Sequence, residues 1–154
     1  MQKGAAAPHY RSQPVPTPSG PVLELVGSTY PAAIADPAKD VLVQLYSPDC
    51  GHCRKLAPVY EAVAKTFADD ADMVVAQIDA TQNDIAGMEP EGFPTILFYP
   101  KGNKKGVEYD GSRDEHDLVQ FVTDARNGKN HVGGLPALEE DETPDEDDGY
   151  RVEL

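Results

Sequence analysis

The sequence predicts an α/β protein in which a central mixed β-sheet is flanked by helices on both faces. Two observations support this fold class. Short apolar runs of strand length alternate with stretches whose apolar residues recur at every third and fourth position, as in amphipathic helices. The run from Val41 to Tyr46 is apolar on both faces apart from Gln44, as expected of a strand covered by helices on either side.

The predicted elements follow the order strand, helix, strand, helix, strand, short helix, strand, strand, helix. The strands are expected at residues 22–26, 41–46, 73–78, 95–99 and 106–109, and the helices at 30–34, 51–68 and 114–126, with the short helix between the third strand and residue 95. Ser28 or Thr29 is suited to cap the first helix, because a hydroxyl can accept from free N–H groups at a helix start. Pro58 should bend the long helix, since proline donates no helical hydrogen bond.

The two ends of the chain differ in composition from the middle. Residues 1–21 contain five prolines and no apolar period, which predicts a Pro-rich disordered linker over residues 1–20. Residues 128–154 are predicted to form an acidic disordered tail, because nine acidic residues and one arginine fall between positions 137 and 154. The predicted folded domain is therefore 21–127, a size that suits one hydrophobic core.

The formal net charge of the chain is −14 at pH 7, and the tail contributes −8 of it. A chain this acidic is not expected to bind nucleic acid or an anionic membrane surface, since both would repel it. No stretch reaches the about 18 apolar residues of a membrane span, and no apolar signal-peptide core follows Met1. We therefore expect a chain that is either cytosolic or lacks its natural start.

Cys50 and Cys53 are the only cysteines, and they stand between the central strand and the long helix. A bridge between them closes almost no loop and so adds little stability. At a helix start, however, the helix terminus lowers the pKa of the first thiol. This placement favours thiol–disulfide exchange over a structural crosslink. A zinc site is disfavoured because it needs about four ligands, and His9, His116 and His131 fall elsewhere in the sequence.

Several motifs together resemble the thioredoxin fold: Cys50-Gly51-His52-Cys53 after a strand, Pro58 in the helix, and Gly92-Phe93-Pro94-Thr95 before the hairpin. More narrowly, the chain from about Gly20 to Arg126 resembles a catalytic domain of the protein disulfide isomerase family. The leading segment 8–16 and the acidic tail are similar to the segments that flank the second catalytic domain in that family. The resemblance therefore implies the C-terminal catalytic domain of a larger multidomain isomerase.

The resemblance, together with thiol chemistry, gives the motif residues their expected roles. Cys50 is expected to be the nucleophile, because the thiolate is the attacking species and Cys50 lies at the exposed helix start. Cys53, one turn further and more buried, is expected to resolve the mixed disulfide. His52 should stabilise the Cys50 thiolate and with it the reduced form; the alternative is a solvent-facing histidine without a role.

Further residues are expected to contact the client, that is, the protein whose disulfides are exchanged. Pro94 matches the cis-proline of the family, which faces the disulfide and offers backbone groups to an extended peptide. The alternative for Pro94 is a plain trans proline that opens a strand. Gly51 and Phe93 are expected to contact the client beside Pro94. Arg113 matches the mobile arginine of the family, which lowers the pKa of the second cysteine. By sequence alone Arg113 is equally consistent with an ordinary loop arginine.

Three positions depart from the family pattern. Asp49 stands where the family has Trp, and its charge should raise the pKa of Cys50 and make the disulfide a weaker oxidant. Gln44 and Gln77 stand where the family has a buried glutamate and its lysine partner. Two amides can bond to each other without charge, so the core should stay satisfied. Because the carboxylate that takes the proton of Cys53 is missing, we expect slower resolution of mixed disulfides.

The predicted function is a thiol–disulfide oxidoreductase and isomerase of secretory-pathway clients in the endoplasmic reticulum lumen. Its expected partners are unfolded or misoxidised proteins and glutathione or an upstream thiol oxidase. No metal and no cofactor are expected to be needed. Any Ca²⁺ binding by the tail should be weak, because the tail lacks the ligand spacing of a folded calcium loop. The last four residues, 151–154, are close to a retrieval signal of the Lys-Asp-Glu-Leu type. The alternatives are a client-binding chaperone module with a slow or vestigial dithiol, and a cytosolic reductant.

Overall fold

The computed structural model describes residues 11–85 and 88–127. The elements it contains are the strands β1 (Leu23–Leu25), β2 (Asp40–Tyr46), β3 (Met73–Asp79), β4 (Thr95–Tyr99) and β5 (Val107–Tyr109), and the helices α1 (Tyr30–Ala35), α2 (Gly51–Thr66) and α3 (Glu115–Arg126). The five predicted strands and three of the four predicted helices are confirmed in place and type, with ends that differ by a few residues.

The strands form one mixed sheet in the order β1-β3-β2-β4-β5. β3 pairs in parallel with β1 and β2, whereas β4 runs antiparallel to both β2 and β5. β2 is therefore the central strand, and every residue in it except Tyr46 is buried. The hairpin predicted between the last two strands is the β4–β5 pair. The chain leaves the carboxyl end of β2 and enters α2 at the cysteines.

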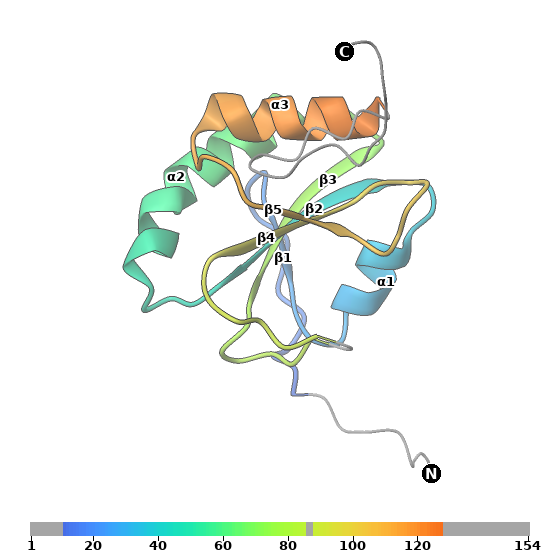
Figure 1. The fold of residues 1–154 in the computed structure, drawn as a ribbon. Helices are drawn as coiled ribbons and strands as arrows, with labels where there is room; N and C mark the ends of the chain where they lie inside the picture. The colour runs from blue at the N-terminus through green and yellow to red at the C-terminus, as the bar shows by residue number, and fades with distance from the viewer. Residues whose placement is uncertain (1–10, 86–87, 128–154) are drawn as a thin grey trace.

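Helices cover both faces of the sheet, as the sequence predicts (Figure 1). One face carries α2 and α3, and its core includes Leu42, Leu56, Tyr60, Phe98 and Phe121. The other face carries α1, and its core includes Tyr30, Val43, Leu45, Ile78 and Leu97. Along each strand the two cores alternate, because successive side chains point to opposite faces of a sheet.

The segment between β3 and β4 differs from the prediction. The short helix expected there is absent from residues 80–85 and 88–94, which the structure describes as turns and bends. Ile85 and Met88 instead pair in an isolated antiparallel bridge, and the Met88 N–H donates to the Ile85 carbonyl at 3.1 Å. The short helix predicted between the third and fourth strands is therefore wrong for the described residues of this segment.

The predicted linker lies partly within the described residues. Residues 11–20 contain no helix or strand, in keeping with an extended segment. They are nonetheless held in place: Arg11 pairs with Asp84, and the Gln13 N–H donates to the Asn83 side chain at 2.7 Å. Residues 1–10 and the predicted acidic tail, 128–154, lie outside the described residues.

Candidate functional site

The dithiol lies at the start of α2, shortly after the end of β2. Cys50 is the N-cap of α2, and its Sγ accepts a hydrogen bond from the Cys53 backbone N–H at 3.2 Å. A helix start leaves N–H groups without intrahelical partners, so sulfur at this position replaces a conventional capping oxygen. Cys50 is partly exposed, Cys53 is only 4% exposed, and both are free thiols. The accessible sulfur is therefore Cys50.

The two thiols have pKa values shifted in opposite directions. The pKa of Cys50 is lowered, first by a hydrogen bond from the Cys53 thiol and then by the backbone N–H groups of Cys53 and His52 and the charge of Arg113. Burial raises the pKa of Cys53 to about 11, with the hydrogen bond to Cys50 adding to it. The arrangement thus favours the thiolate form at Cys50 and the protonated form at Cys53.

The loop before β4 contacts Cys50. The Phe93–Pro94 peptide bond is cis, and the Cys50 thiol donates to the Phe93 carbonyl with sulfur and oxygen 3.7 Å apart. Phe93, Pro94 and Arg113 line one groove of about 340 Å³, together with Gly92. The structure thereby brings together the dithiol and the residues that the resemblance assigned to client contact and thiolate stabilisation.

His52, Gly51 and Asp49 are exposed around the dithiol. His52 acts on Cys50 through its backbone N–H, which helps to lower the pKa of that thiol; a role for its imidazole stays a prediction. Gly51 opens α2 beside Cys50 and has open space where a side chain would project. The predicted effect of the Asp49 charge on Cys50 also stays a prediction.

Gln44 and Gln77 are paired in register on β2 and β3, but their side chains do not form the neutral pair that the sequence suggested. The Gln77 Nε2 donates instead to the Oε1 of Glu24 on β1, at 2.8 Å. The other oxygen of Glu24 accepts from the Tyr46 hydroxyl, also at 2.8 Å. Sequence reasoning missed this carboxylate, because its neighbours depend on β1 lying beside β3.

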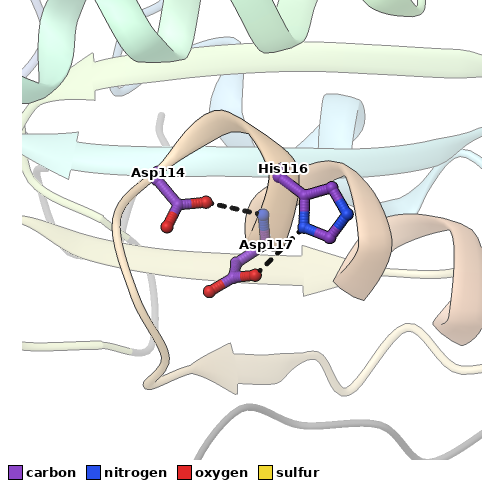
Figure 2. Close-up of side chains that lie close together, drawn as sticks. All are labelled: Asp114, His116 and Asp117. Carbon is purple, nitrogen blue, oxygen red and sulfur yellow. Dashed lines mark hydrogen bonds and ion pairs between the residues drawn. The ribbon is translucent and has the colours of Figure 1, made fainter.

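A second group of polar side chains lies at the start of α3 (Figure 2). The Asp114 carboxylate accepts from the Asp117 N–H at 2.9 Å, and Asp117 pairs with the His116 Nδ1 at 3.3 Å. Within the described residues these three are the one group of His, Cys, Asp and Glu close enough to share a metal ion. Asp114 is already occupied as the helix N-cap, which is a sufficient reason for its presence.

Comparison with known proteins shows the family of the chain. The model of the thioredoxin family matches residues 21–124. The chain is 45% identical over 127 residues to protein disulfide-isomerase A4 of Rattus norvegicus, covering 79% of this chain and 20% of that protein. It is 42% identical over 141 residues to protein disulfide-isomerase of Saccharomyces cerevisiae, covering 90% of this chain and 27% of that protein. The chain thus spans about a quarter of these relatives.

A solved structure agrees with the sequence comparison. The first thioredoxin domain of mouse protein disulfide-isomerase A4 superposes with a TM-score of 0.60 at 32% identity, covering 83% of this chain and 89% of that domain. Within the described residues, no helix is both long and apolar enough to cross a membrane.

Proposed function

The chain belongs to the thioredoxin family as a domain with protein disulfide-isomerase relatives, and on this premise we propose that it forms and rearranges disulfides in secretory-pathway client proteins. One observation carries the proposal: the partly exposed Cys50 has a lowered pKa, while the buried Cys53 beside it keeps its proton. Such a pair can exchange with a client disulfide through a mixed disulfide and then release the client.

The proposed reaction starts from the reduced pair. The Cys50 thiolate attacks one sulfur of a client disulfide, so that a Cys50–client bond forms and the second client sulfur leaves as a thiolate. The Cys53 thiolate then attacks Cys50, closes the Cys50–Cys53 bond and frees the first client sulfur. The client gains two electrons and the pair loses two. Oxidation of a client dithiol is the same sequence in reverse, and either direction lets client disulfides rearrange.

The wider setting is part of the proposal. We take the chain to be the C-terminal catalytic domain of a multidomain protein of the endoplasmic reticulum lumen, with unfolded or misoxidised clients and glutathione or a thiol oxidase as partners. The supporting facts are the likeness to larger isomerases and the acidic residues at the carboxyl end. No cofactor is required for exchange, and weak Ca²⁺ binding by the tail remains part of this proposal.

Equilibration in glutathione redox buffers tests the proposal. Thiols are trapped at each ratio, and mass spectrometry gives the fraction of Cys50–Cys53 disulfide. A reduction potential near about −180 mV would support an oxidase and isomerase, whereas one near about −270 mV would favour a reductant. A pair that does not exchange would contradict the proposal.

A second experiment distinguishes the proposed function from the alternative, a client-binding module with an inactive dithiol. Both cysteines are replaced by Ala, and the variant is tested for reactivation of a client with scrambled disulfides and for suppression of aggregation of an unfolded client. The proposed function predicts loss of reactivation. Full reactivation by the double variant would show that the cysteines do not carry the activity.

A further inference from the structure

The loop that joins β5 to α3, residues 110–114, forms one wall of the groove beside the dithiol. Arg113 belongs to this loop and lines the groove together with Phe93 and Pro94. The Phe93 carbonyl in turn accepts from the Cys50 thiol, with sulfur and oxygen 3.7 Å apart. The position of the loop therefore sets how far the charge of Arg113 lies from the accessible sulfur.

The Arg113 side chain is exposed, and no hydrogen bond or ion pair within residues 11–85 and 88–127 holds its guanidinium. Two other arginines differ in this respect, because Arg54 donates to the Pro48 carbonyl and Arg126 donates to Asp40. A side chain without such a bond follows the backbone that carries it. The backbone of the loop is therefore what places the charge of Arg113.

Tyr109, the last residue of β5, connects this backbone to the core. Its side chain is buried, and its ring packs against Phe121 of α3 with the ring centroids 4.8 Å apart. Its hydroxyl donates to the carbonyl of Ser112, in the peptide group that leads into Arg113. Burial raises the pKa of Tyr109 to about 12, so at neutral pH the hydroxyl keeps the proton that it donates.

Gly111 allows the loop to come this close to the tyrosine ring. A Cβ at Gly111 would lie 2.6 Å from the Tyr109 hydroxyl oxygen and 2.8 Å from its Cζ, which is closer than Cβ atoms approach other atoms. Residue 111 therefore lies against the ring because it has no side chain. The loop thus meets Tyr109 at two successive residues, by contact at 111 and by a hydrogen bond at 112.

The other end of the loop is attached to α3. The Asp114 carboxylate accepts from the Asp117 N–H at 2.9 Å (Figure 2) and from the Ser112 hydroxyl at 2.8 Å. Arg113 therefore lies between a residue bonded to the sheet through Tyr109 and the N-cap of the helix. Only the first of these two attachments comes from a side chain of the strand beside the groove.

The charge of Arg113 favours the thiolate forms of the dithiol. For Cys50 it lowers the pKa in addition to the larger effect of the hydrogen bond from the Cys53 thiol. For Cys53 it lowers the pKa against the larger effect of burial. Because the interaction of two charges weakens with distance, a loop that moves away from the groove would lose part of this stabilisation.

We propose that Tyr109 is a positioning residue for Arg113: its hydroxyl holds the loop so that the guanidinium charge stays at the groove beside the dithiol. This inference rests on the proposed function, since the position of the charge matters for exchange only if the dithiol exchanges. Tyr109 itself does not touch the reacting sulfurs. Without its hydroxyl, the loop keeps the cap at Asp114 but loses its hydrogen bond to β5.

The experiment measures alkylation of Cys50 by iodoacetamide in the whole reduced chain over a pH series, with peptide mapping by mass spectrometry. The variants are Tyr109→Phe, Arg113→Gln and the two combined. Tyr99→Phe is the matched control. Tyr99 and Tyr109 are each 7% exposed, and the Tyr99 hydroxyl lies 2.9 Å from that of Tyr30, in the core on the other face of the sheet.

We expect Tyr109→Phe to slow alkylation of Cys50 by about twofold at a pH below the midpoint, which is the size of effect typical of one exposed charge. The midpoint itself should move to higher pH, because less thiolate is present at each pH. Arg113→Gln should slow alkylation at least as much, and the combined variant should match Arg113→Gln alone. Tyr99→Phe should leave the midpoint where it is, as should any variant that only destabilises the fold.

Two outcomes would overturn the role of Tyr109. One is an unchanged midpoint in Tyr109→Phe, and the other is an equal effect of Tyr109→Phe with and without Arg113, which would show that the tyrosine acts independently of the arginine. If Tyr109→Phe does not fold, Gly111→Ala displaces the same loop and takes its place in the comparison. Glutathione equilibration of the unmodified protein is a separate readout: a pair that does not exchange overturns the proposed function, while alkylation still decides the role of Tyr109.

Discussion

At the scale of single residues, the structure makes two chemically identical side chains behave differently. Cys50 and Cys53 are separated by less than one helical turn, yet Cys50 caps the helix and Cys53 is buried inside its first turn. The cap position offers N–H donors to sulfur, whereas burial penalises a charge on it. Position along the helix therefore shifts the two thiol pKa values in opposite directions, which is the basis of the attacking and resolving roles that we propose for them.

Alkylation of the reduced protein tests this assignment. We expect iodoacetamide to modify Cys50 at neutral pH with a midpoint below that of an ordinary thiol, because the pKa of Cys50 is lowered. Cys53 should remain unmodified until the pH approaches about 11. Peptide mapping across a pH series measures both rates, and a Cys53→Ser variant gives the Cys50 rate alone. Equal reactivity of the two thiols at pH 7 would contradict the assignment.

Replacement of Arg113 tests how a single charge affects the pKa values of the two thiols. Its charge lowers the pKa of both thiols, so Arg113→Gln should raise the pKa of Cys50 and Cys53 together. A less stable thiolate means a less stable reduced form, and the reduction potential should become more negative. Thiolate absorbance against pH and glutathione equilibration provide the two readouts.

Arg54→Gln is the matched control for Arg113. Arg54 is an exposed arginine of the cysteine-bearing helix, and its guanidinium donates to the Pro48 carbonyl at 3.0 Å. It is not among the groups that shift the pKa of either cysteine. If both variants move the thiol pKa equally, general charge rather than the placement of Arg113 is responsible.

At the scale of elements, the position of α2 on the sheet is fixed by a buried hydroxyl as well as by apolar contacts. The Tyr60 hydroxyl donates to the Ala76 carbonyl at 2.6 Å and lies 3.2 Å from the Leu42 carbonyl. These carbonyls belong to β3 and β2, so one side chain of α2 contacts the backbone of both central strands. Burial raises the pKa of Tyr60 well above its ordinary value, which keeps the hydroxyl protonated as a donor.

We expect Tyr60→Phe to lower the free energy of unfolding by about 1–2 kcal/mol, because the ring is kept while a buried hydrogen bond is lost. Urea denaturation with an unchanged m-value provides the measurement. The midpoint of Cys50 alkylation against pH should stay where it is if α2 keeps its place. An unfolding free energy equal to that of the unmodified protein would show that the Tyr60 hydroxyl does not stabilise the fold through these two carbonyls.

The elements that sequence analysis predicted well are those whose signal is local. The apolar run of β2 and the three- and four-residue spacing of α2 each specify one structure, and Cys50-Gly51-His52-Cys53 then falls at their junction. The neighbours of Glu24 are not a local property. They follow from the strand order, which places β1 beside β3 and hence Glu24 beside Gln77.

At the scale of the whole molecule, Asn83 joins three segments that are distant in sequence. Its side-chain oxygen accepts from the Gln13 N–H at 2.7 Å and the Gly27 N–H at 2.9 Å. Its amide donates to the Gln13 Oε1 at 2.9 Å and the Asp79 carbonyl at 3.0 Å. A Cβ on Gly27 would clash with the Arg11 carbonyl, so a side chain there would displace the leading segment.

This junction explains why the predicted linker is not free along its whole length. Composition indicated a disordered segment, because prolines and small residues bury little surface. The bonds that hold Arg11 and Gln13 are made to Asn83 and Asp84, about 70 residues later in the chain. Such a partner is not visible in the segment itself. The leading segment therefore belongs to the folded domain from residue 11 onward, and it forms one wall of the groove that contains Glu24.

We expect Asn83→Ala to lower the free energy of unfolding by about 2–3 kcal/mol, because it leaves buried backbone groups of several segments without partners. Gln13→Ala removes the leading segment's side chain but keeps the bonds of Asn83 to Gly27 and Asp79, so its cost should be smaller. Urea denaturation gives the two free energies, and hydrogen exchange of the Gln13 N–H reports whether the segment detaches. If the two variants cost the same, Asn83 acts only by holding the leading segment, and the junction of three segments would be disproved.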